Sequence, residues 1–187
     1  MNNVDLKSLK LALKAIDVQP YRSQEDVNKD VLSALENSGY RVELFDYGRP
    51  WGGFNQLSNK EADRFIEEFF PGLSNVEARL GDSESQISPK ILVVAPKQRL
   101  SWQYHNRRAE RWAYITDGGY FKSMDDTPGD LQLALSEEVV QFTKGERHRL
   151  VGADTSYTLV AEIWQHTDPS NLSDEDDIIR LSDDYKR

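Results

Sequence analysis

The sequence has no cysteine among its 187 residues, which excludes a disulfide framework and any thiolate metal site. Long apolar runs are also missing, since none approaches the roughly 20 residues that a membrane-spanning helix needs. The N-terminal stretch MNNVDLKSLKLALKA is amphipathic and lacks the continuous apolar core of a secretory signal. From these absences we expect a cytoplasmic protein with no membrane partner.

Basic residues are in the minority, with 23 lysines and arginines against 32 aspartates and glutamates and a formal net charge of -9. Because a broad nucleic-acid surface requires a basic face, we expect no nucleic-acid partner. A small anionic substrate remains compatible with this charge, since a few local arginines can hold a phosphate. Arginines cluster near the middle of the chain, and the acidic run 174–177 is interpreted as a solvated surface segment.

The first 75 residues have mainly helical patterning. A helix should begin after Ser23, which has Asp26 three residues on, and end at Ser38–Gly39. An earlier helix is predicted from apolar residues at approximately helical spacing, namely Leu6, Leu9, Leu11, Leu13 and Ile16.

A third helix is expected from Ser58, with Glu61 completing a capping box, to about Phe70, where Pro71–Gly72 stops it. Before it, residues 41–47 alternate in the manner of a strand, and residues 48–53 are expected to form a tight loop. This first part of the chain is interpreted as a helical lead-in.

From residue 76 onward, short strand-like runs alternate with turn signals such as Asp117-Gly118-Gly119 and Pro128-Gly129. Six or more short strands of this kind predict a mainly β domain, either a sandwich or a barrel. The sequence shows no internal repeat and no low-complexity linker. We therefore predict a single domain over residues 1–187, in which the lead-in of residues 1–75 packs against a barrel and C-terminal tail formed by residues 76–187.

Two of the three histidines lie in segments that could hold a metal ion. If residues 100–105 form a strand, Gln103 and His105 share one face, and an antiparallel partner strand can bring Glu110 back beside His105. A second segment supplies His148 just after a glycine turn. Imidazole, carboxylate and amide oxygen suit a divalent transition metal, although spacing alone leaves core or surface histidines equally open. His166 is interpreted as a surface residue.

The segment RLSWQYHNRRAERW, residues 99–112, resembles the LSLQYHHHRAEHW signature of type II mannose-6-phosphate isomerases, which belong to the cupin superfamily. Three further segments are similar to that family in the same order along the chain. Residues 49–52 resemble its RPWG element, residues 145–150 its GTVHRL element, and residues 176–185 its closing EDDIVRxEDxYGR element. The sequence departs from the family at Lys97, which stands in place of a turn glycine, and at Asn106, Arg107 and Thr143.

The resemblance implies a mainly β fold, a cupin jelly-roll barrel with an N-terminal helical extension. It also implies a divalent metal ion, such as Zn, Mn, Fe, Ni or Co, held by Gln103, His105, Glu110 and His148. Substrate phosphate would be bound by Arg49, Arg180 and Arg187, although Arg180 also has acidic neighbours that could pair with it.

The implied activity is aldose–ketose isomerisation of a phosphorylated sugar, most plausibly mannose 6-phosphate and fructose 6-phosphate, in carbohydrate metabolism. Such an isomerase needs a general base, which the sequence does not identify. A homodimer is expected by family likeness. Two alternatives remain open, namely another cupin metalloenzyme such as a dioxygenase, and a non-catalytic sugar-binding module, because one fold hosts many functions.

Overall fold

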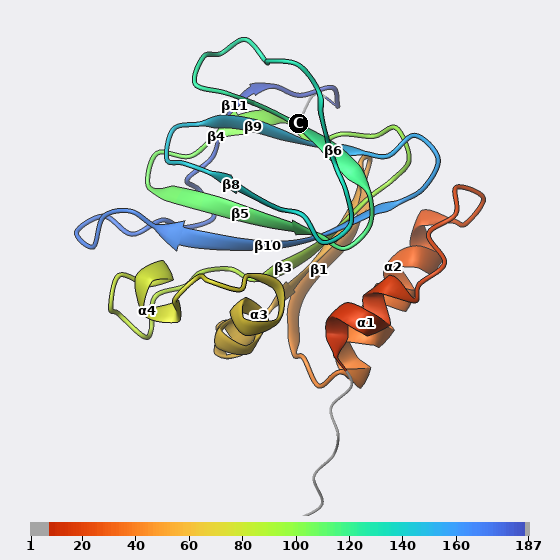
Figure 1. Ribbon diagram of the computed structural model, residues 1–187, viewed down its shortest axis with the longest axis horizontal. Helices are drawn as coiled ribbons and strands as arrows, with labels where there is room; N and C mark the ends of the chain where they lie inside the picture. The colour runs from red at the N-terminus through yellow and green to blue at the C-terminus, as the bar shows by residue number, and fades with distance from the viewer. Residues whose placement is uncertain (1–7, 186–187) are drawn as a thin grey trace, which may run out of the picture.

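The computed structural model describes residues 8–185 and contains two antiparallel sheets that face each other (Figure 1). The larger sheet has the strand order β1-β2-β3-β10-β5-β8, and the smaller has the order β11-β4-β9-β6-β7. Helices cover the outer face of the larger sheet. The protein is thus mainly β, a jelly-roll barrel with an N-terminal helical extension, as the sequence predicts.

The strands of the larger sheet come from both ends of the chain, and β10 is the longest of them. They are β1 (Val42–Arg49), β2 (Gly52–Leu57), β3 (Lys90–Val94), β5 (Arg108–Tyr114), β8 (Val139–Phe142) and β10 (Thr158–His166). Those of the smaller sheet are β4 (Trp102–Tyr104), β6 (Gly118–Ser123), β7 (Gln132–Ala134), β9 (Arg147–Gly152) and β11 (Ile179–Ser182).

The side chains of strand β3 contribute to two apolar cores, one on each face of the larger sheet. Because successive side chains of a strand point to opposite faces, Leu92 and Val94 point between the sheets, while Ile91 and Val93 point toward the helices. All four are buried, which explains the continuous apolar run of this strand. The core between the sheets also contains Trp112 and Tyr114 of β5, on the same face of that strand.

The helices are α1 (Leu9–Lys14), α2 (Gln24–Asn37), α3 (Ala62–Phe69), which follows a 3-10 turn η1 (Asn59–Glu61), and α4 (Asn75–Ala78). Helix α2 begins as predicted, since the Ser23 hydroxyl accepts from the Asp26 backbone N–H at 3.1 Å. Within residues 8–185, no helix combines the length and apolar character needed to cross a membrane.

Two helix predictions need correction. Leu11 was expected on the apolar face of the first helix but is 70% exposed, because the buried face of α1 carries Leu9 and Leu13, four residues apart. Leu6 lies outside the described residues. The capping box at Ser58 does not form, because a 3-10 turn precedes α3 and the Ser58 side chain makes no capping hydrogen bond.

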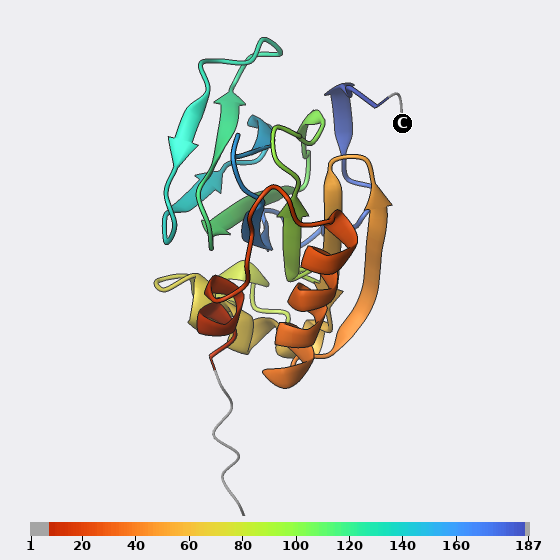
Figure 2. The same ribbon diagram turned by 90° about the vertical axis from the view of Figure 1, so that its right-hand side faces the viewer.

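The predicted loop 48–53 is shorter than expected, because β1 reaches Arg49 and β2 already begins at Gly52. The two strands form an antiparallel hairpin, β2 pairs with β3, and α2 lies alongside the hairpin (Figure 2). A Cβ atom on Gly52 would lie 1.8 Å from the Val93 carbonyl oxygen, so only glycine allows this close approach. The segment predicted as mainly helical therefore also supplies two strands.

Lys97 lies in the turn after β3 and has a φ of 62°, in the left-handed region that favours glycine. Its backbone N–H donates to the Ala153 carbonyl at 3.0 Å, which fixes the turn. Glycine would adopt this backbone conformation at lower cost than lysine.

Candidate metal centre

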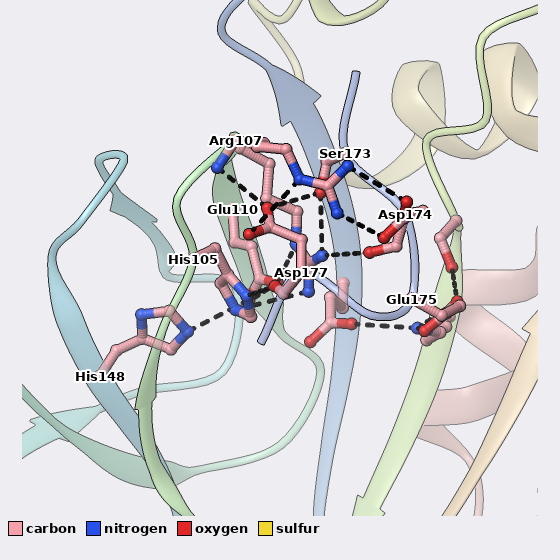
Figure 3. A network of polar contacts seen from close by, with 12 residues as sticks. His105, Arg107, Glu110, His148, Ser173, Asp174, Glu175 and Asp177 are labelled. Atoms are coloured by element: carbon pink, nitrogen blue, oxygen red, sulfur yellow. Dashed lines mark hydrogen bonds and ion pairs between the residues drawn. The ribbon is translucent and has the colours of Figure 1, made fainter. Parts of the chain in front are cut away.

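Three buried side chains converge in the barrel interior: His105, just after β4, Glu110 of β5 and His148 of β9 (Figure 3). His105 Nε2 is 3.0 Å from Glu110 Oε1, and His148 Nε2 is 3.4 Å from Glu110 Oε2. One nitrogen or oxygen from each residue lies within 4.8 Å of the others. These residues come from two distant stretches of the chain, as the sequence predicts.

The route by which they converge differs from the prediction. Strands β4 and β5 were expected to pair as neighbours, but β4 pairs with β9 and β11 in the smaller sheet, while β5 belongs to the larger one. Glu110 therefore meets both histidines across the space between the sheets. The pairing of Gln103 with His148 in the ladder between β4 and β9 keeps these two residues adjacent.

Both histidine rings are oriented by backbone carbonyls. His105 Nδ1 contacts the Asp177 carbonyl, and His148 Nδ1 lies 2.9 Å from the Glu146 carbonyl. Because a carbonyl only accepts hydrogen bonds, each ring donates from Nδ1. In the neutral ring this leaves a lone pair on Nε2, aimed into the cluster, which is the arrangement found at metal-binding histidines. Burial lowers the pKa of His105 and so favours its neutral ring.

Glu110 carries the negative charge of the cluster. Burial acts to raise the pKa of Glu110, but the Arg108 guanidinium beside it helps to hold that pKa well below its ordinary value. Arg108 Nε donates to Glu110 Oε1 at 2.9 Å in a buried ion pair. The carboxylate is therefore ionised inside the barrel.

The buried atoms Glu110 Oε2 and His148 Nε2 have no hydrogen-bond partner among the described residues. A carboxylate oxygen and a ring lone pair facing each other at 3.4 Å repel unless a positive charge lies between them. Two imidazoles and one carboxylate are ligands that transition metals accept. The donor set, its tautomers and its unpaired atoms all fit a divalent cation.

A cavity of about 320 Å³ opens beside the cluster, and Gln103, Arg108 and Glu110 lie in its wall. Gln103 is nearly buried, and its Oε1 accepts from the Ser101 hydroxyl at 2.6 Å. This places the amide next to His148 but gives its oxygen a partner already. Gln103 as a metal ligand stays a prediction.

The cavity wall also contains two of the three arginines that were predicted to bind phosphate. Arg49 Nε lies 2.8 Å from Asp46 Oδ2, and Arg180 extends from β11, whose backbone pairs with Gln103. Arg187 lies outside the described residues. Lys90 and Arg108 add two further cations to the same wall, which sequence reasoning did not assign to it.

The acidic run 174–177 is only partly a solvated surface segment. Asp177 is 5% exposed, and its carboxylate accepts the backbone N–H groups of Asn106 and Arg107, both at 2.9 Å. The expectation for Asp177 is wrong because the tail crosses the turn that follows His105 and satisfies its amides. Figure 3 shows this segment on one side of His105 and Glu110, opposite His148.

His166 is also misplaced by the sequence interpretation, since it is 2% exposed rather than on the surface. Its Nε2 lies 2.8 Å from the Gln86 carbonyl, and its Nδ1 accepts from the Ser173 N–H at 3.1 Å. Both ring nitrogens are therefore engaged in a structural contact outside the cluster.

Glu162 and Lys90 were missed altogether, although both lie in the cavity wall. Each is a charged residue in or beside an apolar strand run, KILVV in β3 and TLVAEIWQH in β10. A charge at an inward position of a doubly buried strand is costly unless it has a partner or a role. A charged residue that interrupts an apolar strand is the sequence feature from which Glu162 and Lys90 could have been predicted.

Comparison with solved structures supports the architecture. A structure of CapF with the inhibitor 3-isopropenyl-tropolone has a TM-score of 0.50 and 12% identity, covering 86% of this chain and 42% of that one. The protein has a cupin fold of the double-stranded β-helix type. At this identity the likeness shows the fold and not the activity.

Two more solved structures have lower TM-scores. The capsular polysaccharide assembling protein CapF from Staphylococcus aureus has a TM-score of 0.49 and 14% identity, covering 84% of this chain and 37% of that chain. A cupin 2 conserved barrel domain protein from Salinispora arenicola has a TM-score of 0.38 and 19% identity, covering 55% and 74%. The chain spans less than half the length of the CapF chains. No protein-family model matches the sequence, and no curated protein matches it.

Proposed function

We propose that this cupin is a divalent-metal-dependent aldose–ketose isomerase of phosphorylated sugars, acting on a pair such as mannose 6-phosphate and fructose 6-phosphate. The observation that carries the proposal is the set of unpaired, mutually facing lone pairs of Glu110 and His148 beside a cavity walled by cations. The sequence resemblance selects the sugar-phosphate chemistry, because a cupin fold alone does not.

In this proposal His105, Glu110 and His148 hold the metal, and Gln103 is the candidate for a fourth position. The metal when bound supplies a Lewis acid, which stabilises negative charge on the substrate oxygens. Suitable ions are Zn, Mn, Fe, Ni or Co, all of which accept imidazole and carboxylate ligands.

The cations of the wall suit the phosphate of the substrate. A guanidinium group offers a bidentate fork to phosphate oxygens, and Arg49 and Arg180 are the two candidates within the described residues. The cavity volume falls at the lower end of the range usual for small-molecule sites, which fits a hexose phosphate better than a larger ligand.

A second candidate function is metal-dependent oxygenation. Two histidines and one carboxylate form the ligand set typical of non-haem iron oxygenases, and His105, Glu110 and His148 provide that set. Oxygen uptake by the iron-loaded protein would favour this reading. Sugar isomerisation in the absence of oxygen would favour the first.

The test is turnover across a panel of hexose and heptose phosphates, followed by NMR, before and after chelation. We expect aldose–ketose conversion by the metal-loaded protein, its loss on chelation and its return on metal addition. The matched control is the same panel of sugars without phosphate, on which turnover should be much slower. Binding without turnover on every phosphorylated sugar would reject the isomerase and leave a sugar-binding module.

A further inference from the structure

Glu162 is a buried carboxylate at an inward position of β10. Its register partners are Trp112 on β5 and Lys90 on β3, so it lies between two neighbouring strands in the middle of the larger sheet. Trp112 Nε1 donates to Glu162 Oε2 at 3.1 Å, which fixes the orientation of the carboxyl group. The residue contributes to the wall of the same cavity as Glu110.

The other oxygen of this carboxyl group is not held in the same way. Among residues 8–185, Glu162 Oε1 accepts no hydrogen bond, and its nearest cation is Lys90 Nζ at 3.9 Å. Lys90 is shared with Glu175, whose Oε1 lies 3.0 Å from the same ammonium. Glu162 therefore has one anchored oxygen and one oxygen free to exchange a proton.

The surroundings of Glu162 raise the pKa of its carboxyl group toward neutral pH. Burial and the charge of Glu110 raise the pKa of Glu162 to about 7, against the lowering effect of Lys90 and Arg108, while Glu175 raises it further. A proton-transfer group works best when its pKa is close to the operating pH.

We propose that Glu162 is the general base that removes the proton from the substrate carbon and returns it to the neighbouring carbon. The inference rests on the proposed isomerase function. Three carboxylates among the described residues line the cavity, and the other two are committed elsewhere. Glu110 is paired with Arg108 and is a proposed metal ligand, and Glu175 is 57% exposed and held by Lys90 and Ser88.

The proton balance of the step is complete without an added reagent. The C2–H bond of the open-chain aldose breaks, and its proton goes to the Glu162 carboxylate. The bonding pair forms a C1–C2 double bond while the carbonyl π pair moves onto O1, which gives an enediolate. The O2 proton then moves to O1. A lone pair on O2 forms the new C2 carbonyl, and the C1–C2 π pair takes the proton from Glu162 to form the new C1–H bond.

The test compares wild type, Glu162→Gln and a matched control, Glu67→Gln, which makes the same change on the exposed side of α3. Each metal-loaded protein is assayed for kcat, KM, metal content and incorporation of deuterium from heavy water into the sugar. We expect Glu162→Gln to lower kcat and deuterium incorporation by about 10²-fold or more, with KM and metal content unchanged. The control should match wild type in all four measurements.

The outcomes separate this inference from the proposed function. An active wild type with a Glu162→Gln variant that keeps its kcat overturns the role of Glu162 and leaves the isomerase standing. A Glu162→Gln variant that loses its metal assigns Glu162 a structural role and also overturns the inference. A wild type that turns over no sugar phosphate overturns both.

If Glu162→Gln does not fold, Glu162→Asp replaces it in the test, because aspartate keeps the charge and retracts the carboxylate by one methylene. A displacement of this size should lower kcat at least about tenfold with metal content unchanged. An unchanged kcat in Glu162→Asp would overturn the inference.

Discussion

At the scale of the residue, Glu162 links the chemistry of the cavity to the stability of the fold. Burial and Glu110 raise its pKa to about 7 from an ordinary value of 4.5, against the opposing effects of Lys90 and Arg108. The folded protein then keeps a proton that the unfolded chain releases. The stability that this gives is present below the ordinary pKa and is lost as the pH rises toward about 7.

Glu162→Gln should therefore stabilise the chelated protein at alkaline pH, because it removes the cost of ionising a buried carboxyl group. At pH 8 we expect the free energy of unfolding to rise by up to about 3 kcal/mol over wild type, and near pH 4.5 the two should agree. Urea unfolding at a series of pH values measures the difference. A difference that does not change with pH would contradict the raised pKa, and Glu67→Gln should show none.

Arg180 is the second residue whose role can be isolated. Arg180→Ala should raise the KM for a phosphorylated substrate roughly tenfold or more, because a charge-assisted contact to phosphate is lost, and leave kcat largely unchanged. Steady-state kinetics measures this, with Arg41→Ala, an exposed arginine away from the cavity, as control. An unaltered KM would remove Arg180 from the phosphate site.

At the scale of the element, the segment that precedes β11 stabilises the turn after β4 through hydrogen bonds. The Asp177 side chain accepts two backbone N–H groups of that turn and the Ser173 hydroxyl, while its carbonyl orients His105. The motif resemblance located this segment near the site. Its burial was missed because four consecutive acidic residues are typical of a solvated surface.

Asp177→Ala should lower the free energy of unfolding by roughly 2–4 kcal/mol, because two part-buried N–H groups and the Ser173 hydroxyl lose their acceptor. It should also weaken metal affinity by about 10–100-fold through the loosened His105 ring. Denaturation and metal titration measure the two effects. Asp176→Ala, one residue away and exposed, is the control, and equal behaviour of the two variants would exclude an anchoring role for Asp177.

The turn after β3 offers a stabilising change. Lys97→Gly should raise the free energy of unfolding by about 1 kcal/mol, because a side chain at a φ of 62° is strained and glycine is not. For a chain of this size that corresponds to roughly 2–4 °C in the melting temperature, measured by calorimetry. A lower melting temperature would show that the lysine side chain contributes more than its backbone strain costs.

At the scale of the whole molecule, the sequence predicted the mainly β fold and the segments that supply His105, Glu110 and His148. Helix α2 was predictable because Ser23 and Gly39 mark its ends locally. Strand β2 was not, because glycine has low strand propensity, and Gly52 and Gly53 are needed for close approaches that the sequence does not show, Gly52 to β3 and Gly53 to Asn28 of α2. Which sheet each strand joins depends on long-range pairing, so the meeting of Glu110 with the histidines across the barrel could not be derived from spacing.

In the proposed site, the two facing sheets hold one divalent cation between His105, Glu110 and His148. The most direct test is metal content by inductively coupled plasma mass spectrometry, after reconstitution and desalting, for wild type, His148→Ala and His166→Asn. We predict close to one ion per chain in wild type and in His166→Asn, which changes a buried histidine outside the cluster, and a loss of the ion in His148→Ala. Full metal occupancy in His148→Ala would contradict the site.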